Sequence, residues 1–122
     1  MPPDAALPAD DRSRMQHMLR AARDAQIILG ELDEAGLTVD MIRSRAVVNC
    51  FTEIGEAASR VTAAGRTVAA QLPWKQIVGM RNIVVHVYWG IDYREIVKTV
   101  RDDLPTLIAA LDQIVQQAPT SE

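Results

Sequence analysis

The sequence predicts an all-α fold, an up-and-down bundle of four long helices, because apolar residues recur every three or four positions along most of the chain. The connections between these periodic segments are short and carry glycine, proline or helix-capping residues. The 122 residues are 48% hydrophobic and 24% charged, which is the composition of one ordinary globular domain. We therefore expect a loose N-terminal tail over residues 1–9 and a single helical domain over residues 10–118.

The first two helices are predicted by their apolar stripes. The first is expected from Asp10 to about Gly36, a residue type that suits the end of a helix. The second is expected to begin at an N-cap, Thr38 or Asp40, and to stop near Gly65. The stripes are Met15, Met18, Ala22, Ala25, Leu29 and Leu32 in the first helix, and Val47, Phe51, Ile54, Ala58 and Val61 in the second.

The second half of the chain predicts two further long helices. Between Thr67 and Leu72 the pattern is weak and fits either a loop or a fifth, short helical turn. Pro73 is expected to start a helix over 74–89, where many Ile and Val residues also suit a strand but the length favours a helix. Asp92 and Glu95 form an acidic capping box for the last helix, which Pro105 is expected to kink without ending. Its stripe is Ile96, Val100, Leu104, Leu107, Leu111 and Ile114.

Composition and charge argue against several classes of protein. The one cysteine cannot form an internal disulfide, and no apolar stretch approaches the ~20 residues of a membrane span, so we expect a cytoplasmic protein with no membrane partner. A formal net charge of −3 gives no overall attraction to nucleic acid, so such a contact would need a local basic cluster. The usual cofactor and zinc motifs are missing, and we expect neither a metal nor a cofactor. Cys50 is expected in the core, and His17 on the surface with no obvious partner.

Four polar side chains interrupt the third predicted helix, which is otherwise strongly apolar: Arg81, Asn82, His86 and Tyr88. Buried polar groups are costly unless they have partners, so this cluster calls for a function or a pairing. Arg81 and His86 are five positions apart and lie about 140° apart around a straight helix. A second copy of the chain, related by a twofold axis, would bring two arginines and two histidines into one cleft and cover the apolar surface. We therefore expect a homodimer.

The run Arg81-Asn82-Ile83-Val84-Val85-His86-Val87-Tyr88 resembles the R-x4-H-x-Y signature of HepT-like toxins in the HEPN superfamily. Other segments are similar to the same family in the same order: Ile54-Gly55-Glu56-Ala57-Ala58, Pro73-Trp74 followed by Ile77, Gly79 and Met80, Trp89-Gly90-Ile91-Asp92-Tyr93, and Asp103-Leu104-Pro105. The resemblance covers roughly residues 10–115.

This resemblance implies a HEPN-like helical homodimer that cleaves RNA without a metal ion, as a bacterial toxin. It also implies a partner, a minimal nucleotidyltransferase antitoxin that silences the toxin by transferring AMP to the tyrosine of the signature, here Tyr88. Histidine titrates near neutral pH and arginine binds phosphate oxygens with a planar fork. We expect His86 to be the general acid and base, Arg81 to hold the phosphate, and Asn82 to orient the histidine or a ribose oxygen. Tyr88 is expected to contact substrate, and Lys75, on the stripe of Asn82 and His86, is a weaker candidate.

The same residues allow interpretations without catalysis. Arg81 could be only the ion-pair partner of Glu53 or Glu56, and Tyr88 a core residue. Trp74 and Trp89 are expected to pack in the core or the dimer interface, although an RNA base could stack on them. The protein could be a non-catalytic helical module that binds substrate for, or docks onto, a nucleotidyltransferase, or a purely structural dimer. A basic rim for RNA could include Arg43, Arg45, Arg66, Lys75 and Arg94.

Overall fold

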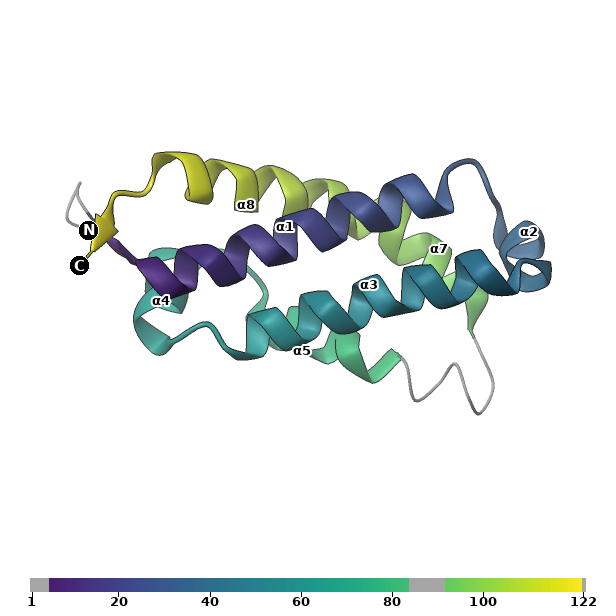
Figure 1. The fold of residues 1–122 in the computed structure, drawn as a ribbon, viewed down its shortest axis with the longest axis horizontal. Coiled ribbons are helices and arrows are strands. Elements are labelled where there is room, and N and C mark those ends of the chain that lie inside the picture. The colour runs from purple at the N-terminus through teal and green to yellow at the C-terminus, as the bar shows by residue number, and fades with distance from the viewer. Residues whose placement is uncertain (1–4, 84–91, 122) are drawn as a thin grey trace.

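The computed structural model describes residues 5–83 and 92–121, and this part of the chain is all-α apart from two very short strands (Figure 1). The predicted all-α class is therefore confirmed. The elements are β1 (Leu7–Pro8), α1 (Ala9–Leu29), α2 (Glu34–Val39), α3 (Met41–Ser59), α4 (Ala63–Val68), α5 (Trp74–Gly79), the 3-10 turn η1 (Met80–Asn82), α7 (Tyr93–Lys98), the π-helical turn η2 (Thr99–Asp103), α8 (Leu104–Gln117) and β2 (Thr120–Ser121).

The long helices α1, α3 and α8 run along the longest axis of the molecule (Figure 1). Helix α1 packs against both α3 and α8, and α5 with η1 packs against the other side of α3. Both described ends of the chain lie at the same end of the bundle, where β1 and β2 pair in parallel. Among the described residues, no helix is long and apolar enough to cross a membrane.

The prediction of a loose tail over residues 1–9 is wrong at residues 7–9, where the chain forms β1 and enters α1. Leu7 pairs with Thr120, its backbone N–H donates to the Pro119 carbonyl at 2.7 Å, and its side chain is fully buried. Arg12 reinforces this end of the bundle, because its guanidinium donates to the carbonyls of Val115 and Ala118 near the end of α8. Burial of Leu7 thus holds the start of the chain against its end.

Helix α1 ends at Leu29, earlier than the predicted end near Gly36. Gly30 has a φ of +53°, in the region that favours glycine, and turns the chain out of the helix. Arg101 then donates to the Leu32 carbonyl at 2.5 Å and to the Gly30 carbonyl at 3.3 Å. Gly36 lies inside α2 instead, where its N–H donates to the Asp33 side chain at 2.8 Å.

Helix α3 begins as predicted and ends early. Asp40 is its N-cap and accepts from the Arg43 N–H at 3.0 Å, whereas Thr38 belongs to α2. The predicted stripe from Val47 to Val61 is buried. The helix ends at Ser59, before the predicted Gly65, because a new helix, α4, starts after Thr62.

A buried carboxylate explains why α4 forms. Asp11 on α1 is only 1% exposed and accepts hydrogen bonds from the Thr62 backbone N–H at 2.9 Å and the Thr62 hydroxyl at 2.5 Å. The Thr62 hydroxyl in turn accepts from the Gly65 N–H at 3.3 Å, which caps α4. The weak segment around residues 67–72 is therefore the end of a short helix, followed by turns.

The remaining helices follow their predicted caps. Helix α5 starts directly after Pro73, and helical structure continues through η1 to Ile83. The rest of the predicted 74–89 helix lies outside the described residues. Asp92 caps α7 by accepting from the Glu95 N–H at 3.1 Å. Pro105 sits in the first turn of α8, directly after the π-helical turn, and the helical path continues as predicted because proline lacks only its own N–H. The predicted apolar stripe from Ile96 to Ile114 is buried on both sides of this proline.

Candidate active site

The candidate site residues fall on both sides of the boundary of the described structure. Arg81 and Asn82 lie on η1, and Lys75 lies on α5. His86 and Tyr88 lie outside the described residues, as does Trp89. The described part of the site is therefore the arginine end of the R-x4-H-x-Y run.

The backbone of Arg81 is packed closely against α3. Gly55 of α3 lies against it: a Cβ atom built on this glycine would lie 2.7 Å from both the Cβ and the backbone N of Arg81, and 2.9 Å from the Val78 carbonyl oxygen. Carbon atoms in contact are normally ~3.5–4.0 Å apart, so a side chain at position 55 would push η1 away. Glycine thus sets the position of Arg81 relative to α3.

The Arg81 guanidinium is held by the next residue of α3. Its Nη1 donates to Glu56 Oε1 at 3.1 Å, and the two side chains are 40% and 49% exposed. Of the two acidic partners that the sequence allowed, Glu56 is therefore the one in contact. Glu53 instead lies 3.6 Å from His17 Nε2, so the surface histidine has a partner that the sequence did not reveal.

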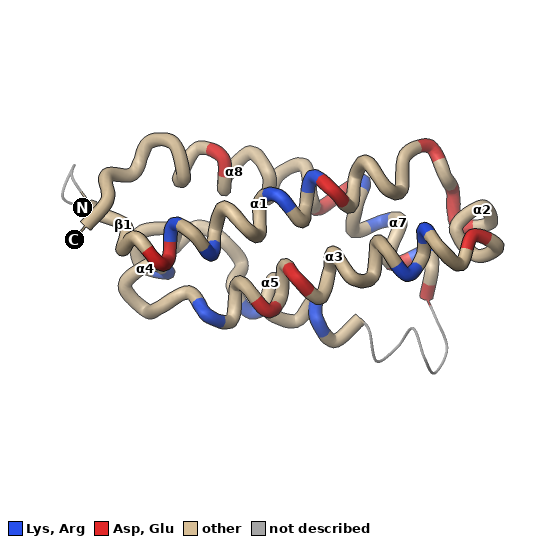
Figure 2. Tube along the Cα trace, in the orientation of Figure 1, with Lys and Arg blue, Asp and Glu red and all other residues tan. Residues whose placement is uncertain are grey.

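Asn82 and Lys75 are exposed, and Ile83 is half-buried. Figure 2 shows basic and acidic residues together on α1, α3 and α7, whereas the charged residues of α4, α5 and η1 are basic only. Within the proposed basic rim, Arg43 lies 3.8 Å from Asp40, so its charge is partly offset.

Arg66, a candidate for the basic rim, is held by contacts with Trp74 and the end of α3. Its guanidinium lies 5.2 Å from the centre of the Trp74 ring and donates to the Ala58 carbonyl at 3.1 Å. The Trp74 indole N–H donates to the Ala69 carbonyl at 3.0 Å, and its ring packs against the core. The packing interpretation of Trp74 is confirmed, and these contacts fix the entry to α5.

Cys50 is confirmed as a core residue. It is 4% exposed, and burial raises the pKa of its thiol to about 11, with a smaller contribution from the nearby carboxylates of Glu53 and Asp24. A thiol with so high a pKa is almost wholly protonated at neutral pH and is a poor nucleophile.

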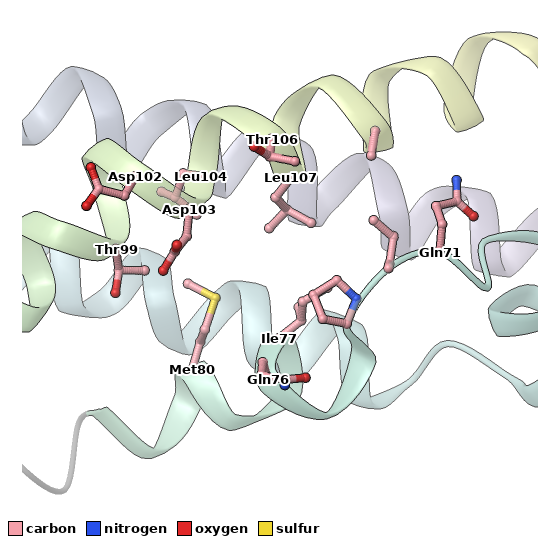
Figure 3. A pocket seen from close by; sticks show the side chains of 13 residues that line it. Gln71, Gln76, Ile77, Met80, Thr99, Asp102, Asp103, Leu104, Thr106 and Leu107 are labelled. Carbon is pink, nitrogen blue, oxygen red and sulfur yellow. The ribbon is translucent and has the colours of Figure 1, made fainter.

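A cavity of about 560 Å³ lies between α5 and the η2–α8 segment. Figure 3 shows Leu107 of α8 facing Ile77 and Met80 across the cavity, with Asp103 at its edge. No local pattern in the sequence predicts this cavity, because its walls come from segments far apart in the chain. The cavity contains none of the predicted site residues.

Among the described residues, no group of three or more His, Cys, Asp or Glu side chains is placed to hold a metal ion. The described part of the site is thus an exposed guanidinium fixed by a glycine and a carboxylate of α3. A guanidinium placed in this way can bind an anionic group such as a phosphate.

Several curated proteins are similar to this chain. "Putative RNase MJ1380" of Methanocaldococcus jannaschii is 31% identical over 98 residues, which are 80% of this chain and 90% of the relative. "Putative RNase TTE0752" of Caldanaerobacter subterraneus subsp. tengcongensis is 35% identical over 78 residues, 64% of this chain and 70% of the relative. "Probable ribonuclease HepT" of Thermococcus cleftensis is 30% identical over 69 residues, 57% of this chain and 63% of the relative.

No solved structure matches the chain at a significant level. The family described as Ribonuclease HepT-like matches residues 18–114, from the third turn of α1 to the last turns of α8. This range includes the Gly55–Glu56 pair and the whole R-x4-H-x-Y run. The chain therefore belongs to the ribonuclease HepT-like family.

Proposed function

We propose that this protein is an endoribonuclease that cleaves RNA without a metal ion and acts as the toxin of a toxin–antitoxin pair. The observation that carries the proposal is the placement of Arg81. It stands at an exposed edge of the α3–η1 junction, at the start of the R-x4-H-x-Y run, in a chain of a ribonuclease family. The exposed guanidinium supports a role in binding the phosphate of RNA.

The proposed reaction divides between Arg81 and His86. His86 removes the proton from the ribose 2′-hydroxyl, whose oxygen attacks the adjacent phosphorus. The bond from phosphorus to the 5′-oxygen breaks, and a protonated histidine gives that oxygen its proton. Arg81 stabilises the negative charge that grows on the phosphate oxygens, and Asn82 orients the histidine or a ribose oxygen. The products are a 2′,3′-cyclic phosphate and a 5′-hydroxyl. Tyr88 contacts the substrate, and Lys75 is a weaker candidate for such a contact.

The proposed site is completed by a second copy of the chain. On one straight helix Arg81 and His86 would lie about 140° apart, too far around for both to face one phosphate. A homodimer with a shared cleft removes this difficulty and supplies two histidines, one to accept and one to donate a proton. Analytical ultracentrifugation at micromolar concentration is expected to find a dimer.

The proposed partner is a minimal nucleotidyltransferase antitoxin. It would transfer AMP from ATP to Tyr88: the phenol oxygen bonds to the α-phosphorus and pyrophosphate leaves. The added phosphate and nucleoside would bring negative charge and bulk to the R-x4-H-x-Y run and compete with RNA for the phosphate site. Intact mass spectrometry after co-expression with such an enzyme tests this step, with Tyr88→Phe as the control that should remain unmodified.

Cleavage of RNA in buffer containing EDTA tests the proposed activity. Purified protein without antitoxin is expected to cut RNA and to leave 2′,3′-cyclic phosphate ends, and the His86→Ala variant is expected to be inactive. Expression of the wild-type protein should arrest growth, whereas expression of His86→Ala should not. Intact RNA after incubation with the wild-type protein, or equal rates for the two proteins, would contradict the proposal.

A further inference from the structure

We propose that Glu56 is a positioning residue for Arg81, and that its carboxylate determines which edge of the guanidinium faces the RNA phosphate. The inference rests on the proposed ribonuclease function and deepens it. Glu56 itself is not proposed to touch the substrate.

The hydrogen bond between the two residues uses one end of the guanidinium. Arg81 donates from Nη1 to Glu56 Oε1 at 3.1 Å, while Nε and Nη2 have no hydrogen bond within residues 5–83 and 92–121. Arginine has five N–H donors in a planar fork, and the Nε and Nη2 donors can bind two phosphate oxygens side by side. A carboxylate on Nη1 restricts rotation of the fork, and no residue of the described ranges bonds to this second edge.

Two consecutive residues of α3 constrain Arg81 at its two ends. Gly55 admits the Arg81 backbone and Cβ into close contact with the helix, and Glu56 holds the tip of the side chain. A long flexible side chain loses conformational freedom when it binds a ligand, so fixing it in advance lowers that cost. The arrangement therefore places the guanidinium before the RNA arrives.

Because the Arg81–Glu56 ion pair is exposed, its effect on positioning can be measured apart from any effect on folding. Arg81 is 40% and Glu56 is 49% exposed, and ion pairs this exposed contribute little to stability because water and salt screen them. Loss of the Glu56 carboxylate is expected to shift Tm by less than about 5 °C. A loss of activity in a Glu56 variant would then not come from unfolding.

Glu53 provides a matched control on the same helix. It lies one turn before Glu56, is 40% exposed, and pairs with His17 rather than Arg81. Glu56→Ala is expected to lower kcat between about 10- and 100-fold, the size of effect caused by a misplaced catalytic group. Glu56→Gln keeps an oxygen that accepts from Arg81 and should lose less, and Glu53→Ala should match the wild type.

A double-variant comparison shows whether Glu56 acts through Arg81. In the Arg81→Ala background, Glu56→Ala should cause no further loss of kcat, because the group that it positions is already gone. Equal kcat for Glu56→Ala and Glu53→Ala would overturn the proposal, and so would a further loss of tenfold or more in the Arg81→Ala background.

Nitrogen NMR of the arginine side chains tests the positioning role without any reaction. Slow rotation of a held guanidinium should give separate Nη signals for Arg81 in the wild type and in Glu53→Ala, and averaged signals in Glu56→Ala. Identical Arg81 spectra in all three proteins would overturn the proposal. A wild-type protein that cuts no RNA would refute the proposed function, and these spectra would still decide whether Glu56 holds Arg81.

Discussion

Replacing Gly55 with alanine should damage both stability and activity, although alanine is the better helix former. The new Cβ would lie 2.7 Å from the Arg81 Cβ and N, about 1 Å closer than normal contact allows. Relief requires η1 to move about 1 Å away from α3. Overpacking of this kind costs about 1–3 kcal/mol, and the higher helix propensity of alanine offsets about 1 kcal/mol of it. We expect a net loss of about 1 kcal/mol and a Tm lower by about 4 °C.

The effect on activity should exceed the effect on stability. A shift of about 1 Å would stretch the 3.1 Å contact between Arg81 and Glu56 beyond hydrogen-bond distance. A misplacement of this size can cost about 100-fold in rate. Thermal unfolding and RNA cleavage at a temperature well below Tm would measure the two effects separately.

Gly79→Ala is the control for this prediction. Apart from its chain neighbours and the backbone of its own helix, no described atom lies within 4 Å of a Cβ built on Gly79, so alanine there has room and should leave Tm unchanged or raise it. If Gly55→Ala proved as stable and as active as Gly79→Ala, the close contact between α3 and η1 would not govern the site.

Three further predictions concern buried groups away from the site. Burial raises the pKa of the Cys50 thiol from 9.0 to about 11, so the free energy of unfolding should fall as pH rises from 9 to 11. Urea unfolding across this pH range should show a smaller fall for Cys50→Ala than for the wild type. An identical pH dependence in the two proteins would contradict the burial of the thiol. Asp11→Ala leaves the Thr62 N–H and hydroxyl without their acceptor and should lower the free energy of unfolding in urea by about 2–4 kcal/mol. An unchanged urea midpoint would show that these hydrogen bonds between Asp11 and Thr62 do not stabilise the fold. Leu7→Ala should cost about 2–4 kcal/mol by thermal or urea unfolding, because Leu7 is fully buried; a loss below about 0.5 kcal/mol would restore the prediction of a loose tail.

Local patterns predicted the helices well because the helical period and the caps are local properties. Residues spaced by three or four along α3 and α8 do face the core, and Asp40 and Asp92 do cap their helices. The ends of α1 and α3 were predicted too late. The apolar period runs on to Leu32 and Val61, but the chain turns at Gly30 and at Thr62, where contacts with Arg101 and Asp11 from distant segments take over.

The residue types of the candidate site could be predicted from the sequence, but the contacts among these residues could not. A single sequence indicates that Arg81 needs a partner, and it left Glu53 and Glu56 as alternatives. Which one faces Arg81 depends on how α3 and η1 pack, which the close contact at Gly55 determines. That contact joins residues far apart in the chain, so no local pattern reveals it.

The single-turnover rate of RNA cleavage by Arg81→Ala tests the central claim most directly. With enzyme in excess over a defined RNA and EDTA present, the wild-type rate constant is expected to exceed that of Arg81→Ala by at least about 100-fold, the usual loss when a group that stabilises transition-state charge is removed. The two proteins should have the same circular dichroism and nearly the same Tm, since Arg81 is 40% exposed. Rate constants within about threefold of each other would contradict the assignment of this guanidinium to catalysis.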